Sequence, residues 1–204
     1  MSETPSWWRD KPLRFSPILE AAIEEFGAKG YHGTPVRDIA RRVGVTVPAL
    51  YYHHANKEAI LLALLDGVTR DFADRAREAD ADAGDDPVRR LQQVVESIAS
   101  GMTSRPELAA LQSELGYLSG ENRERQTAVR DEIEAVLTAV VADGVASGDF
   151  VVDDLAETVR AVLGMLQWIP TWYQPGGASS PADIAERYAR LATRLVGVND
   201  RSCR

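Results

Sequence analysis

Apolar residues recur three and four positions apart along most of this chain, which is the period of an amphipathic α-helix. The pattern predicts helices at about 16–29 and 35–43, a short helix from Val47, and a fourth from 56 to at least 72. Further helices are expected at 87–103, 106–118, 122–147, 153–173 and 181–197. Strand-type alternation is best at 149–152, which is too short to found a sheet. The expected fold class is all-α, with a three-helix head and a larger helical body.

Residues 34–57 carry the turn signals of a helix-turn-helix. Thr34 is expected to cap the first helix, with Pro35 at its first position, where a missing N–H costs least. Gly44 can adopt the left-handed conformation that ends a helix, and Thr46 can cap the next one. Two short helices joined this tightly present the second as a probe that fits a DNA major groove.

The last two predicted helices, 153–173 and 181–197, each carry two apolar stripes. A helix that is apolar on one side packs on its own core, whereas a second apolar side needs a further cover. We therefore expect a two-fold homodimer in which these helices form an intermolecular four-helix bundle. The alternative is one large monomeric core that buries both stripes.

Charge is distributed unevenly along the chain, although its overall net charge is −8. Residues 9–58 hold eight Lys and Arg against six Asp and Glu, whereas residues 59–204 hold fifteen against twenty-four. An acidic body behind a mildly basic head directs DNA to one end of the molecule. We therefore divide the chain into an N-terminal arm and DNA-binding domain (1–58) and a larger helical domain with the expected dimerisation helices (59–204).

Several classes of protein fit the sequence poorly. No run of 18 apolar residues occurs, so no membrane partner is expected, and the first residues lack the apolar core of a secretory signal. Cys203 is the single cysteine, which excludes an internal disulfide and suits the reducing cytoplasm. All three histidines lie in the head, without a glycine-rich phosphate loop or metal-ligand spacing. Neither an enzyme nor a cofactor or metal is expected.

The first fifty-odd residues resemble the DNA-binding head of the TetR family of transcriptional regulators. The resemblance rests on the order and spacing of several short runs: 18–22, 26–31, 33–34, 36–40, 43–45, 50–53 and 57–58. His54 departs from the pattern, because the family usually has phenylalanine there. The resemblance implies a regulator, typically a repressor, that a small effector releases from a palindromic operator. It also implies that residues 59–204 form the effector-binding and dimerisation domain.

The C-terminal body is similar to a subgroup of that family, on a run of residues at 168–170, 172–173, 175–177, 184–185 and 188–189. Members of this subgroup repress fatty-acid and sterol catabolism and respond to acyl-CoA thioesters. The resemblance therefore implies an acyl-CoA effector. A regulator of efflux that responds to a cationic amphiphile, and an architectural DNA-binding protein without an effector, remain alternatives.

Candidate DNA contacts follow from the resemblance. The residues expected to face the groove are Val47, Pro48, Ala49 and Tyr51. Small apolar side chains can touch thymine methyl groups but cannot form bidentate hydrogen bonds to a base, so readout by hydrogen bonds is assigned to Arg37, Thr46 or Tyr51. Phosphate contacts are assigned to Thr34, Tyr52, His53 and Lys57. Two heads are expected to bind an inverted repeat with half-sites at least ~34 Å apart.

An effector cavity is expected between the helices at 106–118, 122–147 and 153–173. The apolar candidates for its lining are Leu111, Leu115, Leu118, Val129, Ile133, Leu137, Leu163 and Trp168. An anionic head group needs cations, and the available arginines are Arg123, Arg125, Arg130 and Arg160, of which Arg125 and Arg160 are counted among the ligand residues. A cationic ligand would instead need Glu96, Glu114 and aromatic rings.

Overall fold

The computed structural model describes residues 13–198, and within that range every regular element is a helix. The all-α prediction is therefore confirmed. Residues 1–12 of the predicted N-terminal arm, and Cys203, lie outside the described residues. The elements are α1 (Pro17–Gly33), α2 (Val36–Val43), α3 (Val47–His53), α4 (Lys57–Asp82), α5 (Pro87–Ser104), α6 (Pro106–Ala110), the 3-10 helix η1 (Leu111–Tyr117), α7 (Gly120–Ser147), α8 (Leu155–Gln167), α9 (Ile169–Trp172) and α10 (Pro181–Leu195).

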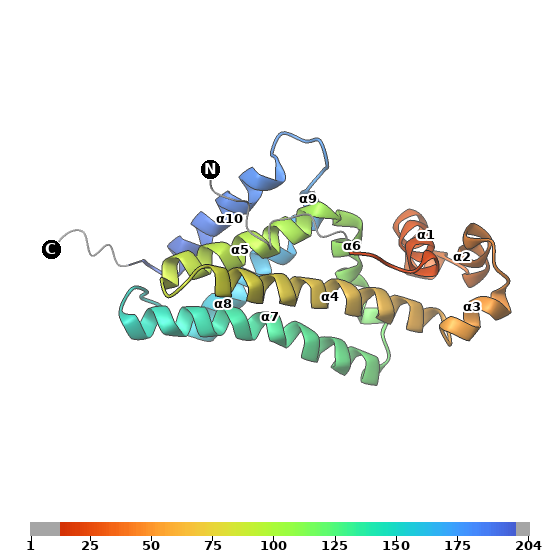
Figure 1. Ribbon diagram of the computed structural model, residues 1–204, viewed down its shortest axis with the longest axis horizontal. Coiled ribbons are helices and arrows are strands. Elements are labelled where there is room, and N and C mark those ends of the chain that lie inside the picture. Colours follow the sequence, from red (N-terminus) through yellow and green to blue (C-terminus); the bar gives the residue numbers. More distant parts are fainter. Residues whose placement is uncertain (1–12, 199–204) are drawn as a thin grey trace.

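Helices α1, α2 and α3 form a small head at one end of the molecule (Figure 1). Gly44 ends α2 with a left-handed φ of 79°, and the Thr46 hydroxyl accepts a hydrogen bond from the backbone N–H of Ala49 at the start of α3. Both signals lie in the loop between the two helices and set their crossing. Gly30 interrupts α1 with a φ of 72°, so the last turn of α1 points differently from the rest.

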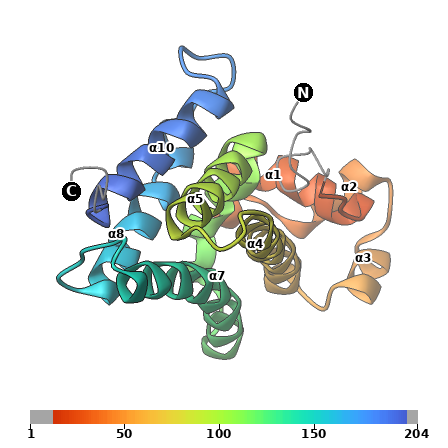
Figure 2. The same cartoon turned by 60° about the vertical axis from the view of Figure 1, so that its left-hand side comes forward.

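The body is built around α4 and α5, which lie between α10 on one side and α7 on the other (Figures 1 and 2). Helix α4 begins at Lys57, so the predicted domain boundary falls inside its first turn. Its first turns pack against α1, and the rest packs against α5 and α7. One uninterrupted helix therefore belongs to both head and body.

Two predicted helices are broken in the structure. The segment 106–118 divides into α6 and the tighter η1. The segment 153–173 divides at Trp168 into α8 and α9, because Pro170 has no N–H to donate to the preceding turn and its ring crowds that turn. The single helix predicted at 153–173 is therefore wrong, and the break turns the chain before the loop to α10.

Within residues 13–198, no helix has both the length and the apolar character required to span a lipid bilayer.

Candidate DNA interface and effector cavity

Helix α3 projects from the head instead of being covered by it. Leu50 is fully buried and anchors the helix in the core of the head. Tyr52 is 88% exposed and Tyr51 is 44% exposed, while Val47 is half-buried. The remaining predicted contacts on this helix and its cap are exposed: Thr46, Pro48, Ala49 and His53. The free face of α3 is therefore a ridge of small residues flanked by aromatic ones.

Some basic residues of the head form ion pairs with carboxylates within residues 13–198, and Arg37 does not. Glu25 is buried and accepts hydrogen bonds from Lys29 Nζ at 2.6 Å and from Arg42 Nε at 2.7 Å. These two cations hold the pKa of the Glu25 carboxyl below its usual value. Arg41 pairs with Asp38 at 3.1 Å. Arg37 is exposed and forms no ion pair with any residue in the described range, so no described carboxylate competes for its guanidinium.

The structure contradicts the roles predicted for Thr34. Pro35, and not Thr34, occupies the cap position of α2, and it makes no side-chain capping bond. Thr34 is completely buried, and its hydroxyl oxygen lies 2.9 Å from the backbone oxygens of both Glu25 and Gly30, which share its one hydrogen. A buried hydroxyl with these partners cannot reach a phosphate, so Thr34 instead fixes the kinked end of α1.

The side-chain ammonium of Lys57 points into the head and binds backbone carbonyl groups there. Its Nζ donates to the carbonyl oxygen of Tyr31 at 2.6 Å and to that of Thr34 at 3.0 Å. The same ammonium lies 4.4 Å from the centroid of the Tyr31 ring, and burial lowers the pKa of the Lys57 side chain. Two of its three N–H donors therefore tie α4 to the turn before α2, and its predicted phosphate contact remains a prediction for the third.

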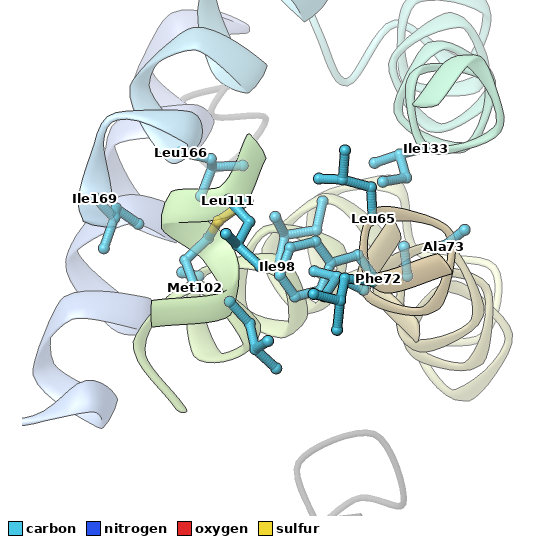
Figure 3. Packing of buried hydrophobic residues seen from close by; sticks show 14 of the residues in the cluster. Leu65, Phe72, Ala73, Ile98, Met102, Leu111, Ile133, Leu166 and Ile169 are labelled. Carbon is cyan, nitrogen blue, oxygen red and sulfur yellow. The ribbon is translucent and has the colours of Figure 1, made fainter. Parts of the chain in front are cut away.

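The body contains a cavity of about 740 Å³, within the range that holds a drug-sized ligand. Phe72 of α4 and Ile98 and Met102 of α5 form its inner wall, and Figure 3 shows these side chains gathered with Leu166 of α8 and Ile133 of α7. The walls from α4 and α5 were not predicted, since the apolar residues of these helices have the spacing of ordinary core residues. Thr69 of α4 also lines the cavity.

The polar edge of the cavity lies mostly on α7. Thr127, Arg130, Asp131 and Glu134 all line it, at spacings of three and four that bring them to one side of the helix. Arg130 forms no ion pair with any residue in the described part of the chain. The cavity therefore combines an apolar interior with a mouth that bears one guanidinium and two carboxylates.

Four of the ten predicted ligand residues line this cavity, namely Leu115, Ile133, Leu163 and Trp168. The prediction that the other apolar candidates line it is wrong, because they are buried in the packing between helices: Leu111, Leu118, Val129 and Leu137. The two predicted arginines are engaged elsewhere, since Arg125 pairs with Asp66 and Arg160 pairs with Glu157.

The other charged groups considered for ligand binding lie outside the cavity. Arg123 donates to the carbonyl oxygens of Gly116 and Leu118. Neither Glu96 nor Glu114 lines the cavity. Burial raises the pKa of the Glu96 carboxyl, with a smaller contribution from the nearby Glu186. Among the residues of these two sets, Arg130 is therefore the one that lines the cavity.

The ends of the chain's last helices present apolar side chains to solvent. Trp168 is 63% exposed, Trp172 41%, Leu191 40% and Leu195 48%. Trp172 stacks on Tyr188 of α10 with ring centroids 6.4 Å apart. On the opposite sides of α8 and α10, Val159, Val162, Ala185, Ala189 and Ala192 are buried. Exposed apolar side chains therefore lie at the α8–α9 junction, on α9 and on α10, opposite the buried stripes of α8 and α10.

Comparison with known proteins gives these sites a context. The model for bacterial regulatory proteins of the tetR family matches residues 18–64, and the model for the tetracyclin repressor-like C-terminal domain matches residues 84–196. The HTH-type transcriptional repressor KstR2 of Rhodococcus jostii is 28% identical over 183 residues, which cover 89% of this chain and 90% of that protein. The fatty acid metabolism regulator protein of Bacillus subtilis is 27% identical over 142 residues, covering 69% and 73%.

A solved structure agrees with both models. The TetR family regulator PfmR from Thermus thermophilus superposes with a TM-score of 0.81 at 33% identity, covering 88% of this chain and 98% of PfmR. The two matched regions correspond to the head with the projecting α3 and to the body with the cavity. The chain therefore belongs to the TetR family of bacterial transcriptional regulators.

Proposed function

We propose that this protein is a homodimeric repressor that binds an inverted-repeat operator and releases it when a small apolar effector with an anionic head group fills the body cavity. The observation that carries the proposal is the pairing of an exposed recognition helix with a 740 Å³ cavity, joined by the single helix α4. Operator binding in the cytoplasm needs no further cofactor in this scheme.

The uncovered apolar side chains of α8, α9 and α10 support the homodimer. Contiguous exposed apolar surface on a protein marks a binding site for another surface. A two-fold dimer covers the same patch on both subunits and gives two heads in opposite orientation. Two heads related in this way match an inverted repeat, with half-sites at least ~34 Å apart.

The cavity supports an acyl-CoA thioester as the effector class. Its interior suits an acyl or ring system, and Arg130 at the mouth supplies a cation for the anionic part. The name of one relative, the fatty acid metabolism regulator protein of Bacillus subtilis, agrees with an apolar metabolite as the effector class. A cationic amphiphile is the second candidate, because Asp131 and Glu134 also line the mouth.

The effector acts by population shift in this proposal. A ligand that prefers the conformation with misplaced heads lowers the fraction of dimers able to span both half-sites. Coupling of ~1–3 kcal/mol between the two sites corresponds to about a 5- to 150-fold loss of operator affinity.

The direct test selects a bound duplex from a random pool, then titrates it with the protein in the presence of oleoyl-CoA or a cationic dye. Release by oleoyl-CoA at micromolar concentration, weakened at least tenfold in Arg130→Gln, is expected. Release of the operator by the cationic dye but not by oleoyl-CoA would show that the effector is a cationic amphiphile. Operator binding that neither probe changes would favour an architectural protein without an effector.

The DNA face is tested separately with Arg37→Ala. Because Arg37 has no ion pair in the described part of the chain, its loss should leave thermal stability unchanged. The loss of one phosphate contact reduces the salt slope of binding by about 0.9, whereas the loss of a base contact costs about 1–3 kcal/mol and relaxes specificity at one position. Arg89→Ala, an exposed arginine on the body that also has no ion pair in the described part of the chain, is the matched control. Unaltered affinity in Arg37→Ala would remove this residue from the interface.

A further inference from the structure

The head contacts the body through a small aromatic cluster, which we call the aromatic latch: Tyr31, His32, Lys57 and Tyr117. The ring of Tyr31 in α1 stacks on that of Tyr117 in η1, with centroids 5.6 Å apart and an interplanar angle of 15°. The His32 ring meets Tyr117 edge-on at 4.2 Å. Aromatic pairs in these arrangements contribute beyond the area they bury, so the latch is a specific joint.

On the head side, the latch is tied to the elements that orient the recognition helix. Tyr31 is buried, and the Lys57 ammonium that lies over its ring also binds the carbonyl oxygens of Tyr31 and Thr34. Thr34 lies two residues before α2, and Lys57 is the first residue of α4. A displacement of the Tyr31 ring therefore acts on the start of both helices.

On the body side, the same short helix reaches the cavity. Leu115 lines the cavity, and Tyr117 follows it by two residues in η1. Successive residues of a 3-10 helix are turned by about 120°, so Leu115 and Tyr117 project from different faces of η1. One face of η1 thus borders the cavity, while another face contacts the head.

The end of η1 is braced, so it is expected to move as a unit. Arg123 of α7 donates to the carbonyl oxygens of Gly116 at 3.0 Å and Leu118 at 3.1 Å. Glu58 of α4 accepts from the backbone N–H of Ser119 at 2.6 Å and from Asn122 at 2.7 Å. The Arg123 bonds hold the end of η1 to α7, and the Glu58 bonds hold the start of α7 to α4.

We infer that η1 is the element that transmits occupancy of the cavity to the head, and that Tyr117 is its positioning residue. A ligand that displaces Leu115 shifts Tyr117 against Tyr31 and His32, and through Lys57 reorients α2 and α4. The inference rests on the proposed function, because it specifies how the ligand and operator sites are coupled.

A double-mutant cycle tests this route without knowledge of the natural effector. Leu163→Trp fills part of the cavity and serves as a permanent occupant, with Ile133→Phe as a second occupant if the first fails to fold. Operator affinity is measured for each occupant variant in three backgrounds: the natural chain, Tyr117→Phe and Tyr117→Ala. The fold-change within each background isolates coupling from any direct effect of Tyr117 on DNA binding or stability.

Filling the cavity is expected to reduce operator affinity about 5- to 150-fold in the natural background. The reduction should persist in Tyr117→Phe, which keeps the stacked ring, and fall below about twofold in Tyr117→Ala. Hydrogen exchange should show the filled cavity altering amides at 111–119 and 30–34 in the first two backgrounds only.

Two results would overturn the inference, and both are distinguishable from failure of the proposed function. A full response in Tyr117→Ala would exclude the latch while leaving ligand-controlled operator binding intact. An occupant that leaves operator affinity unchanged in the natural background would also exclude it, and the separate oleoyl-CoA titration would then decide whether the regulator responds to a ligand at all.

Discussion

Glu25 shows how a single buried carboxylate organises the head. It lies on α1 at 3% exposure and binds both Lys29 of its own helix and Arg42 of α2. Removing one partner from a buried charged network leaves the other charge poorly solvated. The packing of α1 on α2 therefore depends on the ionised form of Glu25.

This dependence predicts an acid-sensitive head. The folded-state pKa of Glu25 is lowered, so its ionic contribution is complete above the unfolded value near 4.5 and is lost as the pH falls through the folded value. The melting temperature of Glu25→Gln should lie below that of the natural protein by a constant amount above about pH 5.5. Thermal melts from pH 3 to 7 should show the gap closing on acidification.

Glu24→Gln is the matched control, because Glu24 also pairs with Arg42 but its side chain is 61% exposed. Its effect should be small, since exposed ion pairs contribute little. A gap for Glu25→Gln that persists unchanged at pH 3 would contradict the ionic role.

Residue roles were the least predictable part of the sequence. Thr34 and Lys57 sit at positions where the family resemblance suggests phosphate contacts, yet both bind backbone oxygens of the head. Their partners depend on the kink at Gly30, which brings the end of α1 back toward α4. A local pattern identifies a hydroxyl or an ammonium but not the carbonyl groups that the tertiary fold places beside it.

At the scale of elements, helix ends with a local chemical cause could be predicted. Gly44 and Thr46 act as expected, and Asn56 caps α4 through a bond from the N–H of Ala59 at 2.7 Å. The break at Trp168 was missed although Pro170 was visible, because apolar periodicity continues through it. The apolar period indicates which side of a segment is buried. It does not show whether the segment is one straight helix or two helices at an angle.

Replacement of Gly144, near the end of α7, by alanine is expected to destabilise the protein. A Cβ atom at this position would lie 2.1 Å from Cδ2 of Phe150, whose side chain is buried. Gly144→Ala should therefore lower the free energy of unfolding by about 1–3 kcal/mol, as for other overpacked cores. Urea denaturation followed by circular dichroism measures this change.

Gly164→Ala in α8 is the matched control, since its Cβ would meet nothing within 4 Å. Alanine is better than glycine in a helix interior by roughly 0.5–1 kcal/mol, so this variant should be as stable as the natural protein or more so. Equal destabilisation of both variants would refute the clash at Phe150.

At the scale of the whole molecule, the all-helical division into head and body could be predicted, but the cavity could not be outlined. Its lining extends from Thr69 to Thr171, and Phe72, Ile98 and Met102 have the spacing of ordinary core residues. Whether an apolar side chain borders a void or another side chain depends on how distant helices meet, and no local pattern records it.

The proposed dimer yields a prediction at the same scale. Leu191→Asp places a charge in the apolar patch of α10, and a charge buried at an interface is costly. Sedimentation velocity should show a monomer, and operator affinity should fall because one head cannot span two half-sites. Val145→Asp on α7 is the matched control, because Val145 and Leu191 are both 40% exposed. A Leu191→Asp protein that stays dimeric would move the interface elsewhere.

The continuity of α4 has a mechanical consequence for any dimer of this protein. At 1.5 Å per residue, its 26 residues make a rod about 39 Å long. If the body end is the pivot, a tilt of only about 5° swings the head end by roughly 3 Å over that length. Two such rods swinging apart would change the span between heads by about twice as much, a sizeable fraction of the ~34 Å helical repeat. A small displacement within the body, which need not disturb its packing, is therefore enough to move both recognition helices out of register with the major grooves of the operator.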